Sequence, residues 1–146
     1  MTIATYHLEI GFQDGPSRDI GDTGTASGVR WTDISSAMLS FNTRTGRQHE
    51  LDRTEAGTLT VMLDNRSRAF DPTYSLSPFT TGLTPLRPVR LKATVNGTSV
   101  YNIWTGYAEA WTQQYTLGGH PVVELRAGLF QKDQPLSETW VYRWTP

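Results

Sequence analysis

The stretch from Thr58 to Leu63 constrains the fold more than any other part of the chain. Leu59, Val61 and Leu63 alternate there with threonines and a methionine. A period of two residues is typical of a β-strand with one buried face. The stretch therefore predicts a strand that lies on a hydrophobic core.

The residues that follow this strand predict a structured loop. Asp64 and Asn65 have short polar side chains that bond to nearby backbone, so we expect them to end the strand. We expect Phe70 to fold back onto the sheet and hold the loop in place. Asp71 precedes a proline, which favours an extended backbone at that position.

Similar alternation recurs along the chain, and no segment of ten or more residues has a helical period with a cap at each end. The sequence therefore predicts an all-β protein: an antiparallel β-sandwich or partly open β-barrel of about seven to eight strands with long loops. We interpret residues 1–146 as a single β domain, with long loops at 13–30 and 72–88. The second loop is expected to carry the chain from one sheet edge to the other. The further strands are predicted at 4–12, 31–42, 88–95, 99–117 (bent at Gly106), 121–129 and 138–144.

Two of these strands carry specific expectations. In 31–42, Ala37, Leu39 and Phe41 are placed together on one face. After 88–95, the Asn-Gly pair predicts a hairpin. A three-residue loop at 95–97 would place Leu91 opposite Tyr101 and Val89 opposite Ile103, which pairs apolar residues.

Composition narrows the range of functions. The chain has a formal net charge of −1 and no cysteine. The charge argues against general nucleic-acid binding, and the lack of cysteine excludes disulfides, thiolate metal sites and thiol nucleophiles. No apolar run is long enough to span a bilayer, and the N-terminus has none of the features of a signal peptide. We expect synthesis in a reducing cytoplasm.

The residues that could carry chemistry form no recognisable site. The three histidines are scattered, no serine stands in a nucleophile motif, and phosphate-binding loops are missing from the sequence. Asp52, Asp64 and Asp71 could gather around calcium, but arginines lie among them, and ion pairing is the favoured interpretation. We therefore expect no enzyme activity, no cofactor and no metal.

The C-terminal residues give the most specific hypothesis for a subunit interface. Trp140, Tyr142 and Trp144 would share one face of a terminal strand within the aromatic segment 138–146. Large aromatic side chains are seldom left in water. They would either complete the core or dock on another subunit by strand addition, and the sequence leaves both open. Asp19 and Arg30, in the 13–30 loop, are further candidates for a subunit interface.

Several short motifs share an order and spacing that resembles minor tail proteins of tailed bacteriophages, of the hub or distal-tail type. These motifs extend over most of the chain. They are Trp31–Ile34, Gly46–Arg47, Glu50–Arg53, Ala56–Thr58, Leu63–Arg66, Phe70–Pro72, Arg87–Arg90 and Trp104–Tyr107, with Pro85 and Tyr101.

The resemblance implies a structural component of a phage tail tip or baseplate. Such a component would form a ring, three-fold or six-fold, that joins the tail tube to distal host-recognition or penetration proteins. Its partners would be copies of itself and other tail proteins, without nucleic acid and without membrane insertion. It would be made in the host cytoplasm and reside in the virion tail.

A carbohydrate-binding β-sandwich module is the alternative hypothesis, because exposed aromatic rings stack on sugars. Its candidates are Trp104, Trp111, Trp140 and Trp144. At least two of these rings would have to lie in line on an open face.

Overall fold

Seven antiparallel strands form one open sheet in the computed structural model, which describes residues 3–14, 29–44, 57–115 and 117–128. The order across the sheet is β2-β1-β5-β6-β7-β4-β3. Two short 3-10 helices, η1 (Ser35–Ala37) and η2 (Thr80–Gly82), lie between strands. The strands are β1 (Ala4–Ile10), β2 (Thr32–Asp33), β3 (Met38–Arg44), β4 (Thr58–Asp64), β5 (Pro88–Val95), β6 (Ser99–Gln114) and β7 (Val122–Gly128). The predicted all-β antiparallel fold is confirmed.

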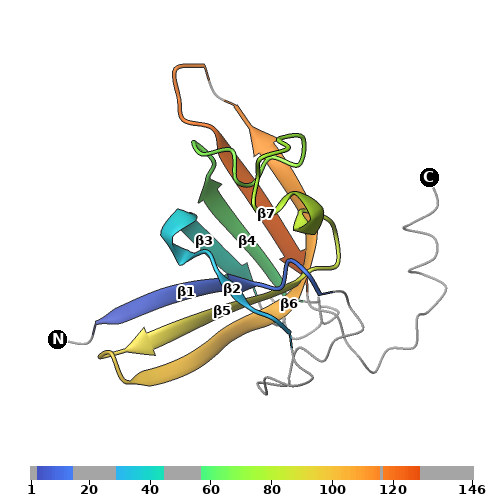
Figure 1. Cartoon of the computed structure of the whole chain (residues 1–146). Coiled ribbons are helices and arrows are strands. Elements are labelled where there is room, and N and C mark those ends of the chain that lie inside the picture. Colours follow the sequence, from blue (N-terminus) through green and yellow to red (C-terminus); the bar gives the residue numbers. More distant parts are fainter. Residues whose placement is uncertain (1–2, 15–28, 45–56, 116, 129–146) are drawn as a thin grey trace, which may run out of the picture.

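The long strand β6 belongs to two halves of the sheet. Residues Ser99–Tyr107 pair with β5, and Tyr107–Gln114 pair with β7. Figure 1 shows β1 and β5 running across the view while β4 and β7 run up it, so the two halves cross steeply. Orthogonal sheet packings are joined in this way, by a strand that bends from one layer into the other.

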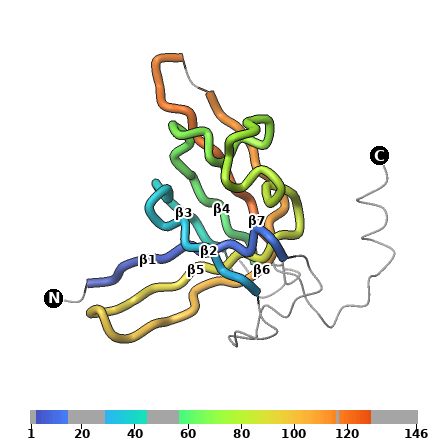
Figure 2. Tube along the Cα trace, in the orientation of Figure 1, coloured from blue at the N-terminus to red at the C-terminus, as the bar shows by residue number. Residues whose placement is uncertain are grey.

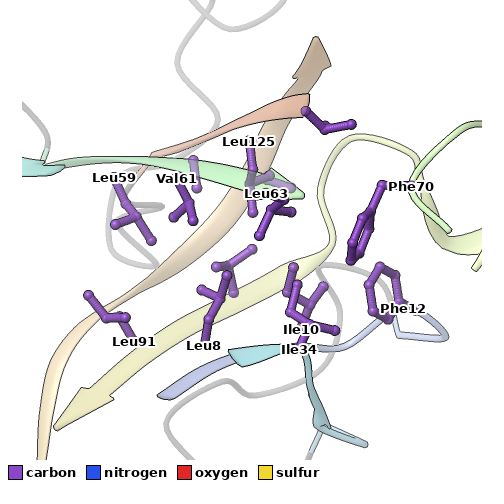
Figure 3. Close-up of a cluster of buried hydrophobic side chains, with 14 of the residues drawn as sticks. Leu8, Ile10, Phe12, Ile34, Leu59, Val61, Leu63, Phe70, Leu91 and Leu125 are labelled. Carbon is purple, nitrogen blue, oxygen red and sulfur yellow. The ribbon is translucent and has the colours of Figure 1, made fainter. Parts of the chain in front are cut away.

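The core lies between these halves (Figure 3). One half contributes Leu8 and Leu91, which are directly opposite in the register of β1 and β5. The other half contributes Leu59 and Val61 from β4, and Leu125, which pairs with Val61, from β7. All five side chains are fully buried. The alternation in these strands predicted their inward faces correctly.

Gly106 lies at the bend of β6, where the sequence predicted it. A Cβ atom at this position would stand 2.3 Å from the carbonyl oxygen of Gly128 and 2.5 Å from the Trp104 ring. The bulges themselves lie on either side, because Ile103 and Glu109 are extra residues in the ladders with β5 and β7. Bulges increase local twist and bend a strand, so they help β6 turn from one half into the other.

The predicted strand 31–42 is wrong as a single element. It is divided into β2, η1 and β3. Asp33 accepts a hydrogen bond from the Ser35 amide (2.8 Å), and the Ser35 hydroxyl oxygen accepts one from the Leu8 amide (2.9 Å). The first bond closes a turn after β2, and the second holds η1 against β1, so the chain does not continue as a strand. The register of β3 also shifts between Met38 and Ser40, and Leu39 is 59% exposed while Ala37 and Phe41 pack against the core, so the three do not share one face.

The hairpin between β5 and β6 has the predicted loop length but a different register. Its three-residue loop is 96–98, one residue later than predicted, with Asn96 and Gly97 both at positive φ. The bulge at Ile103 then shifts the pairing of the following β6 residues with β5 by one position. Leu91 pairs with Trp104, and Val89 pairs with Gly106. The predicted pairs with Tyr101 and Ile103 are therefore wrong, and both of those side chains are exposed.

The segment between β4 and β5 is a long irregular crossover, as predicted, but it does not join sheet edges. Both strands lie inside the strand order. Figure 2 shows the segment as a series of turns beside β4 and β7. A backbone hydrogen bond closes each of several successive turns, including Arg68 N–H to the Asn65 carbonyl (2.9 Å) and Ser77 N–H to the Tyr74 carbonyl (3.0 Å).

Replacement of Gly106 by alanine tests the close approach at the bend. The added methyl group would overlap the Gly128 carbonyl and the Trp104 ring. We expect a loss of about 1–3 kcal/mol in the free energy of unfolding, measured by urea denaturation. Gly118→Asn is the control, since nothing lies within 4 Å of its Cβ position and asparagine tolerates positive φ. An unchanged urea midpoint for Gly106→Ala would show that the bend can accommodate a methyl group, and would contradict the close approach.

Candidate functional site

The Asn65 side chain makes the central hydrogen bonds of the loop that follows β4. Its side chain is buried, and its Oδ1 accepts a hydrogen bond from the Phe70 amide (2.9 Å). Its Nδ2 donates to Oε1 of Gln113 on β6 (2.9 Å), and Nε2 of Gln113 donates to the Phe70 carbonyl (2.6 Å). The two amides thus fix the loop to β6. Buried polar groups are stable only when paired in this way.

Phe70 lies inside this loop with its ring in the core. The ring is stacked against Phe79 (centroids 5.6 Å apart) and Trp111 (6.4 Å apart). Phe12 is also stacked on Phe79, with centroids 4.2 Å apart. The four rings close one end of the sandwich. Phe70 therefore folds back onto the sheet and anchors the loop.

The carboxylates of the loop are held by its arginines. Asp64 accepts hydrogen bonds from Arg66, with Nη2 at 2.6 Å from Oδ2. Asp71 accepts from Arg68, with Nη2 at 2.8 Å from Oδ2, and Arg68 lies over the ring of Tyr74 at 4.5 Å. These contacts match the ion-pair interpretation. Within the described ranges no group of three potential ligands could hold a metal ion, and Asp52 lies outside those ranges.

The pKa values of both carboxyl groups are lowered by these bonds. The hydrogen bond from the Thr73 side chain is the largest cause at Asp71, and with the Arg68 guanidinium it lowers the pKa from 3.8 to about 2. The side-chain hydrogen bond from Arg66 lowers the pKa of Asp64. Both groups remain ionised at neutral pH and stabilise the turns around them.

Hydrogen bonds hold the two ends of the 13–30 loop together. Asp14 is buried, and its carboxylate accepts hydrogen bonds from the Arg30 amide (2.8 Å) and from Nη2 of Arg30 (3.2 Å). Arg87 donates from Nη1 to the Asp14 carbonyl (3.1 Å). Arg30, which the sequence offered as an interface residue, thus joins the two ends of this loop. Asp19 lies outside the described residues.

The outer face of β1 and β5 carries a charged network. Glu9 on β1 pairs with Arg90 and, at 3.0 Å, with Lys92, both on β5. The Arg90 guanidinium lies 4.2 Å from the centre of the Trp31 ring. These opposite charges lie on neighbouring strands and hold β1 to β5 on the side away from the core.

Two hairpin ends carry large apolar side chains that the core does not cover. Val100 and Tyr101, at the start of β6, are 61% and 58% exposed, and the bulged Ile103 is also exposed. Tyr115 and Leu117 are exposed at the turn between β6 and β7. Figure 1 shows the two ends pointing in different directions, one at the left and one at the top. We name them the β5–β6 tip and the β6–β7 tip.

The sequence did not identify the β5–β6 tip as a surface. Apolar residues stand at positions 100, 101, 103 and 104, more than one face of a strand can bury. This excess of apolar residues was the signal in the sequence that could have indicated an exposed apolar surface. The residues that the sequence did propose for docking, Trp140, Tyr142 and Trp144, lie outside the described residues.

Trp104 and Trp111, the two described candidates, do not form a sugar-stacking row. Trp104 is buried in the core. Trp111 packs against the core, stacks on Phe70, and donates a hydrogen bond from Nε1 to the Thr84 carbonyl (3.3 Å). Neither ring is free to bind a ligand on an open face. Trp140 and Trp144 lie outside the described residues.

Comparison with known proteins gives one short match. A segment of 33 residues is 54% identical to part of "Glucans biosynthesis protein G" of Bradyrhizobium diazoefficiens. The match covers 23% of this chain and only 7% of that protein. No family model matches the sequence. In the described ranges, no helix has the length and apolar character needed to cross a membrane.

The lowered pKa of Asp71 predicts a pH dependence of stability. Because the folded-state pKa is depressed, the contribution is present above about pH 4 and is lost as pH falls toward about 2. We expect Asp71→Asn to lower the urea midpoint at pH 7 and to flatten its dependence on pH between these values. Asp64→Asn is the comparison, with a smaller loss because the Asp64 side chain is 21% exposed, against 6% for Asp71. If the urea midpoints of Asp71→Asn and of the unmodified chain had the same dependence on pH, the stabilising role assigned to ionised Asp71 would be wrong.

Proposed function

We propose that this chain is a structural component of the tail tip or baseplate of a tailed bacteriophage. Copies would assemble into a ring that joins the tail tube to distal host-recognition or penetration proteins. In this proposal the chain has no active site, and its partners are further copies and other tail proteins. The observation that carries it is the β5–β6 tip, where an apolar surface extends beyond a filled core.

The exposed side chains at this tip favour a protein partner. Val100, Tyr101 and Ile103 lie within a few residues of each other on one strand. Clustered apolar side chains on a surface mark interaction sites more often than isolated ones do. Tyrosine is also enriched in interface cores. The order of motifs that resembles phage tail proteins agrees with this interpretation.

The separation of the two tips suits a ring. In a ring, one surface of each copy contacts a different surface of the next copy. The β5–β6 tip and the β6–β7 tip point in different directions (Figure 1), and β6 extends from one to the other. Each tip therefore presents its own surface, and a tail component needs several such surfaces for its neighbours.

The mass of the full chain in solution tests this proposal. We expect particles of several chains at high protein concentration. The double variant Val100→Lys/Tyr101→Lys should shift the mass to that of a single chain, because charged side chains on an exposed edge oppose pairing. Leu76→Lys is the control, since Leu76 is an exposed apolar residue in the crossover between β4 and β5 and is not part of the β5–β6 tip. An unmodified chain that remains a monomer at high concentration would contradict the proposal.

A carbohydrate-binding module is the second candidate function. Two observations favour it: the short match to a protein named for glucan biosynthesis, and a pair of exposed tyrosines. Tyr6 and Tyr101 both pair with Ala93, so they stand on either side of it on one face. Two rings in such a row could stack on neighbouring sugar units.

Titration with soluble glucans separates the two functions. A binding module would bind as a monomer, and Tyr6→Ala and Tyr101→Ala would each weaken the affinity measured by calorimetry. Tyr115→Ala, at the other tip, is the control. Under the tail-tip proposal we expect no heat of binding for the unmodified chain. Saturable binding that depends on both tyrosines would favour the module.

A further inference from the structure

The turn between β5 and β6 contains the pair Asn96-Gly97, and both residues have positive φ, at 50° and 71°. The Thr98 amide closes the turn by donating to the Val95 carbonyl (3.1 Å), and the ladder with β5 resumes at Ser99. The Gly97 amide therefore belongs neither to the closing bond nor to the ladder. Asn96 and Gly97 are both exposed, so water reaches the side-chain amide and the backbone nitrogen that follows it.

Glycine leaves the approach to this side chain open. An asparagine closes a five-membered ring when the backbone nitrogen of the next residue attacks its Cγ atom, and a Cβ atom on that residue crowds the approach. Gly97 has no Cβ atom, and nothing lies within 4 Å of the position where one would stand. The reacting atoms belong to neighbouring residues, and such intramolecular reactions have a large advantage over reactions between separate molecules.

A hydrogen bond to Ile3 is the restraint that the described residues place on the Asn96 side chain. Oδ1 of Asn96 accepts from the Ile3 amide at 3.2 Å, and the Asn96 amide donates to the Ile3 carbonyl at 2.9 Å. The first bond is exposed and lies at the long end of the normal range, so it is a weak restraint on rotation toward Gly97. The two bonds together join the turn to the start of β1.

The other three asparagines of the chain lack this combination. Asn65 is buried, and both ends of its amide are hydrogen-bonded. Asn42 and Asn102 lie within β3 and β6, and the residues after them, Thr43 and Ile103, are branched at Cβ. These three asparagines are therefore internal controls for the chemistry of Asn96.

We propose that Asn96 is a self-modification site, at which the folded chain converts this asparagine to aspartate and isoaspartate with water as the co-reactant. The Gly97 nitrogen loses its proton and attacks Cγ of Asn96. The new N–Cγ bond replaces the Cγ–Nδ2 bond, and the side-chain nitrogen takes up a proton and leaves as ammonia. Water then opens the ring, at Cγ to give aspartate or at the backbone carbonyl carbon to give isoaspartate. The net reaction exchanges an amide for a carboxylic acid, with no oxidation or reduction.

The two products affect the turn differently. Each adds one negative charge to a chain whose formal net charge is −1. In aspartate, a carboxylate oxygen still accepts the hydrogen bond from the Ile3 amide. In isoaspartate, the backbone passes through the former side-chain carbon and is longer by one methylene group. A tight turn with two positive φ values does not accommodate that extra group, so isoaspartate releases the start of β1 from the turn. This consequence does not depend on the proposed ring.

Peptide mass mapping of the full chain tests the proposal. The folded protein is kept in mildly alkaline buffer, because the attacking nitrogen must lose its proton. Samples are digested over time with chymotrypsin, which cleaves after Tyr101 and so separates Asn96 from Asn102. We expect the mass gain of an amide-to-acid exchange in the peptide that contains Asn96, with no gain at Asn42, Asn65 or Asn102. An isoaspartyl methyltransferase should label the same peptide.

Asn96→Gly is the matched control, since glycine tolerates positive φ and removes the reacting side chain, and it should show neither signal. The isolated isoaspartate form should unfold at a lower urea concentration than Asn96→Asp, which carries the same charge and keeps the acceptor for Ile3. Equal urea midpoints for these two forms would overturn the release of β1. If the folded chain keeps the asparagine mass while the chain unfolded in urea gains the acid mass, the turn prevents ring closure and the proposal is wrong. Equal rates of mass gain at all four asparagines would also overturn it.

Discussion

The close approach of β6 and β7 at Gly106 and Gly128 is the constraint on which the rest of the structure depends. The space at Gly106 does not admit a Cβ atom, so the backbone of β7 lies directly against the bend. The bend lets one strand serve both halves of the sheet, and the halves then enclose a single core. Within the described residues, the first half of β6 pairs with β5 and its second half pairs with β7. The bend at Gly106 thus fixes where the two halves of the sheet meet.

Sequence patterns predicted the parts of the fold in which burial follows a strict period. The inward residues of β1, β4, β5 and β7 all follow from alternation, since each strand has one face on the core. The pattern failed where an extra residue changes the phase. Leu39 and Ile103 both lie at shifts in register, and a bulge of one residue moves the following side chains to the opposite face. Nothing local in the sequence marks the position of such a bulge.

The candidate site was predictable in its local contacts and not in its distant ones. Short polar residues after β4 predicted a structured loop, and the contacts of Asp64, Phe70 and Asp71 within that loop involve near neighbours in sequence. The bond between Asn65 and Gln113 joins residues far apart in the chain and depends on the fold. The same is true of the clamp between Asp14 and Arg30. The β5–β6 tip became visible only when the register showed that the core cannot cover Tyr101.

Amide hydrogen exchange along β6 tests the central claim most directly, that one bent strand belongs to both halves of the sheet. In dilute solution we expect slow exchange at the amides of Ser99–Tyr107 that bond to β5 and at the amides of Tyr107–Gln114 that bond to β7, because both ladders belong to one fold. The two sets of amides should lose their protection together as urea is added. Loss of protection in one half of β6 at a urea concentration that leaves the other half protected would contradict the account.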